Sequence, residues 1–576
     1  MSRIATNTIK MDNWLPRSIQ CLRSYTLAQF THDLVAGVTV GLVALPLAMA
    51  FGIASGVPPQ AGLYTAVVAG FLISALGGSR LQIGGPTGAF VVIVAGIVAK
   101  FGTSGLALVT ILAGVLLLIM GLTGLGTAVK FIPRPVTIGF TNGIAVLIAS
   151  TQIRDFLGLT TPPVPSEFFA RMRMLLDHLT TARWQTIAVA AASLAVVLFW
   201  PRITKRVPGS IVALFAATAA TVLFHLPVET IGSKFGGIPR GFPHFTAPNL
   251  HAEHILPLLP SVFTVAMLAA VESLLSAVVA DGMSGDRHNS NVELAAQGIA
   301  NIASPLFGGI PATGAIARTA TNIRSGAQTP VSGMVHALTL LVILLVAAPL
   351  ARFVPLATLA AVLLVVAYNM GEWREIGTIM QLTKTDIAVW FTTFALTVLA
   401  DLTTAVGVGM ALAALLYIYR IAETTTVAPV TYEYLRDGLP HILQDKEIPA
   451  NVTILRIHGP FLFGTTEKLV DATREIQSFA PVVIVRLRNM TALDATGMHA
   501  LEQFADRLRK AGKTVLFCGA RDQPARLLAR PDFVAHIGPQ NILPHVQAAL
   551  VRAREINSGF EGVGWEFAAD LAAKSL

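Results

Sequence analysis

The sequence predicts an α-helical protein that crosses a membrane fourteen times, as two inverted repeats of seven segments, followed by a small α/β domain. Three observations predict this fold. The 576-residue chain is 54% hydrophobic and only 13% charged, whereas soluble domains carry about 25% charged residues. Apolar runs near the ~20 residues of a spanning helix recur between Leu34 and Ile421. Two distant apolar segments are interrupted in the same way, at Gly84–Ala89 and Gly308–Ala315.

The composition narrows the classes of protein to which this chain can belong. The mean hydropathy is +0.67, and the net charge of +9 fits basic residues on cytoplasmic loops better than a nucleic-acid-binding surface. Cys21 and Cys518 are the only cysteines, so no disulfide framework is expected. Residues 1–30 are polar, show no cleavable signal peptide and are expected to form a cytoplasmic N-terminal segment. No nucleic-acid partner is predicted.

Residues 31–421 form the predicted transmembrane domain. The third and tenth segments are the interrupted ones, and each follows two segments of its own half, which divides the chain into seven plus seven. A repeat with an odd number of segments inserts upside down relative to its partner. The expected segments are 34–54, 61–77, 86–99, 105–125, 133–152, 184–200, 208–225, 259–283, 291–305, 314–326, 331–349, 354–371, 385–400 and 403–421.

The distribution of charged residues predicts how the chain is oriented in the membrane. With the basic N-terminus inside, loops after even-numbered segments face the cytoplasm, and these loops are rich in lysine and arginine. The outward loop 55–60 has no charge, whereas the longer outward loop 153–183 holds both signs. We therefore expect a multi-pass protein of the inner (plasma) membrane with both termini in the cytoplasm. The basic loop residues are Lys130, Arg134, Arg202, Lys205, Arg206, Arg374 and Lys384.

The composition changes after Arg420. Residues 422–448 read as a polar linker, 449–555 as a soluble domain and 556–576 as a C-terminal tail. Within the domain, patterns typical of strands and helices alternate, which favours a small α/β fold. The expected strands are 452–458, 481–488 and 513–518, and the expected helices are 465–477 and 496–511.

The two interruptions predict a site for an anion. Glycine and proline break each helix at membrane depth, and such backbone is tolerated only where protein or a wet cavity satisfies it. A helix that begins there directs free N–H groups and a positive dipole end at the cavity. Thr87, Gly88 and Ala89 open the first short helix, and Thr313, Gly314 and Ala315 mirror them. The alternative is ordinary packing of small residues between membrane helices.

Glu272 lies near the middle of segment 259–283, whose other acid, Asp281, lies two residues from the end of the segment. An ionisable group at this depth costs ~3 kcal/mol or more, so it is a functional candidate. A desolvated carboxyl group gains a proton more easily, which suits a proton carrier, and Ser276 lies one turn away. The alternative is a structural ion pair with Arg318, which follows the second helix start. Arg318 could also neutralise the anion directly or extend its charge to the cytoplasmic surface.

Other polar positions have more ordinary interpretations. Glu293, Gln297 and Asn301 form an i, i+4 stripe that favours contacts between helices over a ligand set. Asp494 or Thr496 could cap the helix that follows, and Thr496 could alternatively be a phosphorylation switch. The histidines show no metal-ligand spacing, and no Walker, serine-triad or HExxH motif occurs. We therefore expect no enzyme activity, metal or cofactor.

Several motifs resemble the SulP anion permease family, which includes solute carrier family 26. The run 45–51 (Leu-Pro-Leu-Ala-Met-Ala-Phe) followed by 57–64 (Val-Pro-Pro-Gln-Ala-Gly-Leu-Tyr) is similar to the first-segment signature of that family. The runs 139–143 and 152–158 also match. Residues 494–498 (Asp-Ala-Thr-Gly-Met) resemble a STAS domain motif. The sequences around Glu272 and Arg318 are most similar to the bacterial branch that contains a C4-dicarboxylate transporter.

The resemblance implies a uracil-permease-like fold with a core domain (segments 1–4 and 8–11) and a gate domain (5–7 and 12–14), usually in a homodimer. It implies a site between segments 3 and 10, near Phe51. Leu47 stands where many members have glutamine, and Ala495 replaces a serine of the STAS motif, where Thr496 takes the phosphoacceptor position. The predicted substrate-binding residues are Phe51, Thr87, Gly88, Ala89, Phe90, Thr313, Gly314, Ala315 and Arg318, with Glu272 for ion coupling and Thr496 for regulation.

The predicted function is secondary active transport of a small anion, with the site carried by the core domain past the gate domain in an elevator-like motion. Sulfate and C4-dicarboxylates such as succinate or fumarate lead as substrates, with a proton as the coupling ion. Alternatives are sodium-coupled bicarbonate transport, a passive anion channel of the same fold, and a membrane-bound sensor or enzyme, against which the lack of a catalytic constellation argues. A cytoplasmic protein could bind the STAS-like domain, and membrane lipid surrounds the rest.

Overall fold

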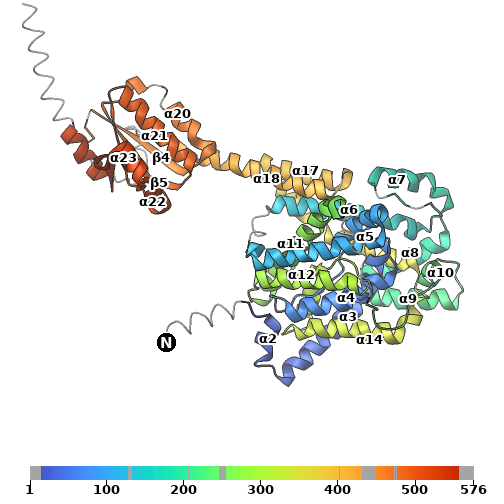
Figure 1. Cartoon of the computed structure of the whole chain (residues 1–576). Helices are drawn as coiled ribbons and strands as arrows, with labels where there is room; N and C mark the ends of the chain where they lie inside the picture. Colours follow the sequence, from blue (N-terminus) through green and yellow to red (C-terminus); the bar gives the residue numbers. More distant parts are fainter. Residues whose placement is uncertain are drawn as a thin grey trace, which may run out of the picture. The chain divides into compact units, whose positions relative to one another are not determined.

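The structure, a computed structural model, forms two compact units, Met1–Ala413 and Ala414–Leu576. The first unit is helical and the second contains a five-stranded sheet (Figure 1). The boundary between the units falls within helix α18 (Leu402–Thr424). The structure describes residues 14–127, 133–162, 164–165, 167–204, 207–245, 255–400, 402–430, 448–449, 451–472, 474 and 476–556.

Each of the fourteen predicted membrane segments lies largely within a helix. The third and fourth share α5, which continues through Gly102, where a φ of 68° interrupts the helical geometry. In the described part of the chain, nine helices are long and apolar enough to cross a membrane. The helices of the first repeat are α3 (Leu27–Ala54), α4 (Pro59–Leu76), α5 (Gly88–Leu122), α6 (Arg134–Leu157), α8 (Trp184–Ile203) and α9 (Gly209–Leu223). Those of the second are α11 (Ile255–Ser284), α12 (Ser290–Leu306), α13 (Ile316–Arg324), α14 (Val331–Ala351), α15 (Leu356–Met370), α17 (Lys384–Leu399) and α18.

Local sequence signals fix several helix ends. The Thr26 hydroxyl accepts from the backbone N–H of Gln29 while the Gln29 side chain accepts from that of Thr26, which forms a capping box before α3. Helix α4 begins at Pro59, where the missing N–H costs nothing. Helix α6 ends at Gly158, whose φ of 65° is the left-handed conformation that glycine adopts easily. Four short helices join these elements: α2 (Arg17–Leu22), α7 (Phe168–Asp177), α10 (Ile231–Phe235) and α16 (Trp373–Ile379).

The same pairs of helices are in contact when each helix is replaced by its counterpart in the other repeat. Exchanging the halves replaces α3 by α11, α4 by α12, and the second part of α5 by α14. The contact of α12 with α5 thus corresponds to that of α4 with α14, and the contact of α3 with α14 corresponds to that of α11 with α5. Likewise α17 packs on α6 as α15 packs on α8. Glycines permit the closest of these approaches, because a Cβ atom at Gly114 of α5 would lie 2.7 Å from the Gly298 carbonyl oxygen of α12. Such exchange symmetry is expected of an inverted repeat.

The contacts also sort the helices of the first unit into two groups. Helices α3, α4, α5 and α11–α14 pack on one another, and α6, α8, α9, α15 and α17 form a second group. Fewer contacts join the groups, mainly α3 with α15 and α5 with α6. These correspond to the core and gate groups expected of the fold, apart from α18 (segment 14), which was expected in the gate group but is not among the closely packed helices of the second group.

The second unit is an α/β domain whose sheet has the order β3-β4-β5-β6-β7. Strands β4 to β7 run parallel, while β3 pairs antiparallel with β4. Helices cover both faces, with α21 over one apolar cluster and a helix at 546–556 over the other. The strands are β3 (Thr426–Pro429), β4 (Val452–Phe461), β5 (Val482–Leu493), β6 (Thr514–Cys518) and β7 (Ile542–Leu543). The helices are α20 (Thr466–Ala472), α21 (Ala495–Lys510), α22 (Asp522–Leu528) and α23 (Pro531–Ile537).

The segment 422–448, expected to be a linker, begins with regular structure. Helix α18 continues to Thr424, and β3 adds an edge strand to the sheet. Only four residues form β3, too few to show a reliable alternation of apolar and polar side chains. Residues 431–447 of the predicted linker and 557–576 of the predicted tail lie outside the described residues.

Candidate anion site

The two interruptions meet in a short antiparallel ladder. Strand β1 (Gly84–Gly85) pairs with β2 (Thr313–Gly314), with Gly84 opposite Gly314 and Gly85 opposite Thr313. Helix α5 begins just after β1, and α13 begins just after β2. Because each helix follows its strand closely, α5 and α13 begin at the same short ladder, and their N-termini share one location.

Glycine is required in this ladder. A Cβ atom on Gly314 would lie 1.7 Å from the side-chain nitrogen of Gln82, which donates to the Ser273 carbonyl oxygen. Gly85 has a φ of 145°, and a Cβ atom there would lie 2.7 Å from Nη1 of Arg318. The glycines in the two matched motifs therefore serve close backbone approach rather than flexibility.

The first helix start has no side-chain cap. Thr87 is the N-cap of α5 in extended conformation, but its hydroxyl donates to Oε2 of Glu272 at 2.8 Å instead of accepting from its own helix. Among the described residues, no acceptor pairs with the backbone N–H groups of Gly88 and Ala89. These two groups and the positive end of the helix dipole are available to an anion.

The second helix start is shifted from the predicted residues. Helix α13 begins at Ile316 with Ala315 as its N-cap, and the Ala315 N–H donates to the Ile83 carbonyl oxygen at 2.8 Å. Thr313 does not mirror Thr87, because its side chain is fully buried and its hydroxyl donates to the Ala269 carbonyl oxygen at 3.0 Å. The sequence motif placed this helix start two residues too early, since it cannot distinguish a strand residue from a helix cap.

Arg318 lies one turn into α13 and is 3% exposed. Its Nη2 atom donates to the carbonyl oxygen of Pro86, directly before the first helix start. Its Nη1 atom is buried and has no hydrogen-bond partner in the described part of the chain. A buried guanidinium with an unused donor is costly unless a ligand or water pairs with it.

Glu272 and Arg318 do not form an ion pair with each other; none of the ion pairs between described residues joins them. Glu272 binds Thr87 and Arg318 binds Pro86, so the two charges flank consecutive residues at the start of α5. Ser276 does not share hydrogen bonds with Glu272 either, because its hydroxyl bonds to that of Thr319 at 3.1 Å.

Phe51 lies beside the first helix start, as predicted. A Cβ atom on Gly88 would meet the Phe51 ring at 3.4 Å, and Ile148 and Met370 at 3.1 Å each. Ile148 and Met370 belong to α6 and α15 of the gate group, so Gly88 lies where the two groups meet. Sequence reasoning missed both residues because nothing in their local pattern distinguishes them from other apolar side chains.

Ala89 and Phe90 contribute backbone rather than side chains. Their side chains are 0% and 1% exposed and belong to the large apolar cluster of the first unit. Any role in binding an anion therefore rests on their N–H groups, of which that of Phe90 already donates to the Thr87 carbonyl oxygen at 3.3 Å.

The interhelical stripe on α12 holds both interruptions in place. The Glu293 carboxylate accepts from the N–H groups of Gly78 and Ser79 at 2.9 and 3.0 Å, and from Gln297 at 2.9 Å. Asn301 donates to the Ala312 carbonyl oxygen and accepts from the Ala312 N–H, both at 2.8 Å. The stripe thus supports the loops that lead to β1 and β2, which agrees with a structural interpretation.

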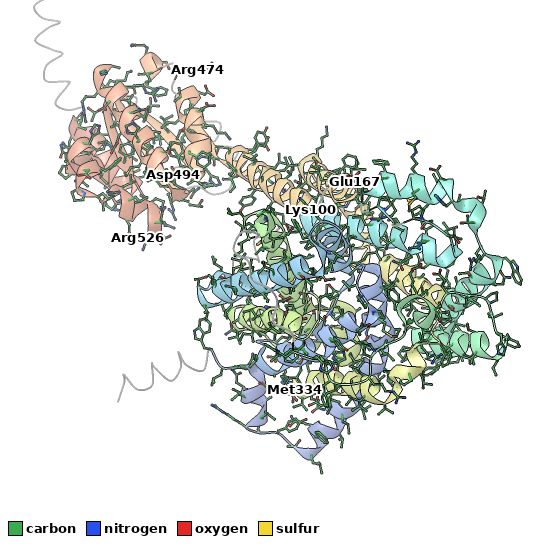
Figure 2. All side chains as sticks on the ribbon, turned by 45° about the vertical axis from the view of Figure 1, so that its right-hand side comes forward. Lys100, Glu167, Met334, Arg474, Asp494 and Arg526 are labelled. Carbon is green, nitrogen blue, oxygen red and sulfur yellow. The ribbon has the colours of Figure 1, made fainter. Side chains whose placement is uncertain are left out.

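A cavity of about 770 Å³ lies between α5 and α11 on one side and α6, α17 and α18 on the other. Lys100 and Glu167 are among the residues that line it, and Figure 2 labels both. Val92, one turn beyond Gly88, also lines it, whereas the residues of the ladder do not.

In the second unit, Asp494 caps α21. Its Oδ1 accepts from the Gly497 N–H at 2.7 Å, and its Oδ2 accepts from the Phe463 N–H at 3.0 Å. Thr496 is exposed in the first turn of the helix, and Figure 2 shows Asp494 in this unit. Among the described residues, no group of three or more histidine, cysteine or acidic side chains could hold a metal.

Comparison with known proteins identifies the chain. The profile of the sulfate permease family matches residues 30–393, and that of the STAS domain matches residues 444–549. A putative sulfate transporter of Bacillus subtilis, YvdB, is 42% identical over 525 residues, which cover 91% of this chain and 98% of that protein. The bicarbonate transporter BicA of a Picosynechococcus species is 30% identical over 535 residues, covering 90% and 94%.

The fold also agrees with a solved structure. The overall structure of SLC26A9 matches with a TM-score of 0.85 at 17% identity, covering 97% of this chain and 96% of that one. These relatives are named for sulfate, bicarbonate or solute carrier family 26, so the dicarboxylate branch suggested by two short motifs receives no support from them. The chain is a multi-pass anion transporter that belongs to the sulfate permease family and carries a C-terminal STAS domain.

Proposed function

We propose that this protein is a proton-coupled transporter that carries sulfate through the site at the β1–β2 ladder. The observation that supports this most directly is the buried Nη1 atom of Arg318, which lacks a partner in the described structure and lies where two helix starts meet. The similarity to a putative sulfate transporter over nearly the whole chain favours sulfate as the first substrate to test.

Charge balance connects the substrate to the coupling ion. The two helix starts contribute about half a positive charge each, and Arg318 contributes one more. About two positive charges match a dianion such as sulfate only when Glu272, bonded to Thr87 beside the site, carries a proton. Binding of the dianion and protonation of Glu272 therefore favour each other, which is the linkage that symport requires.

Movement of the site follows from the two helix groups. The ladder, Arg318 and Glu272 all belong to the core group, whereas Ile148 and Met370 of the gate group cover Gly88. In our proposal the core group carries the site past these gate side chains. The cavity with Lys100 and Glu167 is then the outward approach, and both chain termini lie in the cytoplasm.

Sodium-coupled bicarbonate transport is the second candidate. When Glu272 stays ionised, its carboxylate and the Thr87 hydroxyl offer oxygen ligands for Na⁺ beside the anion site. The 30% identity to a bicarbonate transporter over 90% of the chain also favours this candidate. The two candidates differ in which gradient drives uptake.

The test is uptake of labelled sulfate, bicarbonate, succinate and fumarate into liposomes that contain the purified protein, with an imposed pH or Na⁺ gradient. We expect pH-driven sulfate uptake, and half-saturation about 100-fold weaker in Arg318→Gln, since a charge-assisted contact is worth ~2–3 kcal/mol. Arg324→Gln is the matched control, because Arg324 is an exposed arginine at the end of the same helix. Unaltered half-saturation in Arg318→Gln, or uptake of no anion above protein-free liposomes, contradicts the proposal.

A further inference from the structure

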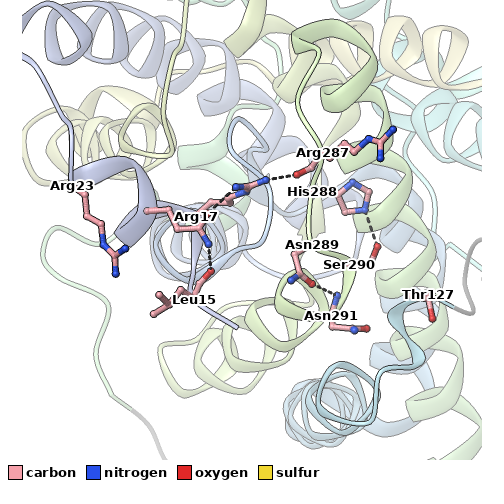
Figure 3. A pocket seen from close by; sticks show the side chains of 10 residues that line it. Leu15, Arg17, Arg23, Thr127, Arg287, His288, Asn289, Ser290 and Asn291 are labelled. Atoms are coloured by element: carbon pink, nitrogen blue, oxygen red, sulfur yellow. Dashed lines mark hydrogen bonds between the residues drawn. The ribbon is translucent and has the colours of Figure 1, made fainter. Parts of the chain in front are cut away.

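A second cavity, of about 650 Å³, lies at the other end of the core group (Figure 3). It is formed where the N-terminal helix α2 meets the turn between α11 and α12. Its walls carry the guanidinium groups of Arg17, Arg23 and Arg287, together with the polar side chains of Asn289 and Ser290. The lining is therefore strongly basic.

Only one of the three arginines is neutralised. Arg17 pairs with Asp286 at 3.6 Å and donates to the Arg287 carbonyl oxygen at 2.5 Å. The other nearby acid, Asp281, is occupied by Nδ1 of His288 at 2.6 Å. Within the described ranges, no acid or acceptor pairs with the side chain of Arg23 or Arg287, so about two positive charges remain uncompensated.

The location of the cavity favours a membrane headgroup as its occupant. It lies at the end of α11 and the beginning of α12, which the orientation in the proposed function places at the cytoplasmic surface. Anionic lipids of that leaflet attract basic pockets beside membrane helices. The inference rests on that orientation but not on the identity of the transported anion.

The arrangement of the arginines distinguishes a lipid from a free ion. In Figure 3 the side chains of Arg23 and Arg287 extend to opposite sides of the cavity instead of converging on one point. Guanidinium groups that do not converge fit the extended headgroup layer of a membrane better than a single phosphate ion. We propose that this cavity binds the headgroups of anionic phospholipids.

Residues that line the cavity form hydrogen bonds with the loop that leads to the anion site. The backbone N–H of Arg17 donates to the Gly77 carbonyl oxygen, and that of Asn289 donates to the Gly78 carbonyl oxygen, both at 3.0 Å. The loop then continues to β1 at Gly84. A bound headgroup that orders α2 and the α11–α12 turn therefore stabilises the backbone from which the site is built, and anionic lipid should raise the thermal stability of the transporter.

The test is thermal unfolding of the full chain in nanodiscs of phosphatidylcholine with increasing phosphatidylglycerol. We expect the melting temperature to rise with phosphatidylglycerol in the wild type. In the double variant Arg23→Gln/Arg287→Gln, the phosphatidylglycerol concentration that gives half of the rise in melting temperature should increase about 30-fold. This factor is ~2 kcal/mol of binding free energy, or about 1 kcal/mol per arginine. Arg374→Gln is the control, because it removes an exposed arginine that does not line the cavity.

Two further measurements make the result decisive. Arg23→Lys/Arg287→Lys retains the charge and should retain most of the lipid effect. Inorganic phosphate and glycerol phosphate, added to phosphatidylcholine nanodiscs, should not reproduce it. Equal lipid dependence in the Gln variant and the wild type would overturn the proposal, as would a full effect from phosphate alone. Liposome uptake is measured separately, so failure of the lipid site leaves the transport proposal standing.

Discussion

Replacing Glu272 by glutamine removes a titratable group while keeping its contact. The Thr87 hydroxyl donates to Oε2 of Glu272 at 2.8 Å, and a glutamine side-chain oxygen can accept the same hydrogen bond. Gln is close to Glu in size and shape, so the start of α5 should remain in place. We expect Glu272→Gln to abolish proton-driven accumulation of sulfate while substrate binding persists.

The size of each effect follows from these contacts. One coupled proton contributes 1.36 kcal/mol per pH unit, which is a tenfold accumulation of substrate for each unit of the gradient. Glu272→Gln should reduce this to no accumulation. A hydrogen bond to a charged group is worth ~1.5–3 kcal/mol and one between neutral groups ~0.5–1.5 kcal/mol. The proposed bound state already holds Glu272 protonated and neutral, so the neutral glutamine should alter binding by at most about 1 kcal/mol, and the dissociation constant should change by no more than about fivefold.

The assay compares uptake under a one-unit pH gradient, with the membrane potential held at zero, and binding in detergent. Glu372→Gln is the control, since Glu372 is an exposed acid between α15 and α16. A folded Glu272→Gln protein that still accumulates sulfate tenfold refutes the proton-carrier role. If Glu272 were instead the structural partner of Arg318, Glu272→Gln would misfold and Arg318→Gln would rescue it; the absence of an ion pair between them predicts no rescue.

Three other predictions follow from the structure. Gly314→Ala should destabilise the protein by about 1–3 kcal/mol, because its Cβ atom would displace Gln82, whereas Gly282→Ala, with open space around it, should be neutral or stabilising in the same thermal melt. Glu293→Gln should cost about 2 kcal/mol, since it removes the charge from a group that accepts from two buried N–H groups, and a melting temperature equal to wild type would contradict this. Burial raises the pKa of Cys518 from 9.0 to about 12. In a Cys21→Ser background its thiol should thus react with a disulfide reagent at pH 8 about 1,000-fold more slowly than in unfolded protein, in proportion to the smaller fraction of thiolate. Its contribution to stability is constant below pH 9 and is lost as the pH rises towards 12, and equal labelling rates would refute this.

Sequence patterns predicted the membrane segments well, because each requires a long apolar run and because glycine and proline mark the interruptions. The matched motifs at Gly84 and Gly308 predicted that two helix starts lie together at one site, and the ladder between Gly84 and Gly314 confirms that the two interruptions meet, although the second helix starts later than expected. The predicted strands and helices of the STAS domain also match, because each follows a clear apolar pattern.

The remaining parts depend on contacts that no local pattern encodes. Thr87 and Thr313 occupy equivalent positions in their motifs, yet one hydroxyl faces Glu272 and the other a backbone carbonyl oxygen. The covering side chains Ile148 and Met370 come from helices far along the chain and are ordinary apolar residues in sequence. Strand β3 was missed because four residues at a sheet edge gave too short a signal.

The ladder between β1 and β2 has a consequence for the synthesis of the protein. Its partners lie about 230 residues apart, so at 5–20 residues per second the first strand waits roughly 10–45 seconds for the second. During that time the loop at Gly78 also lacks Glu293, and Pro86 lacks Arg318, because both residues belong to the second repeat. The first repeat therefore enters the membrane before β1 and its flanking residues have their hydrogen-bond partners. The second repeat supplies those partners when it is synthesised.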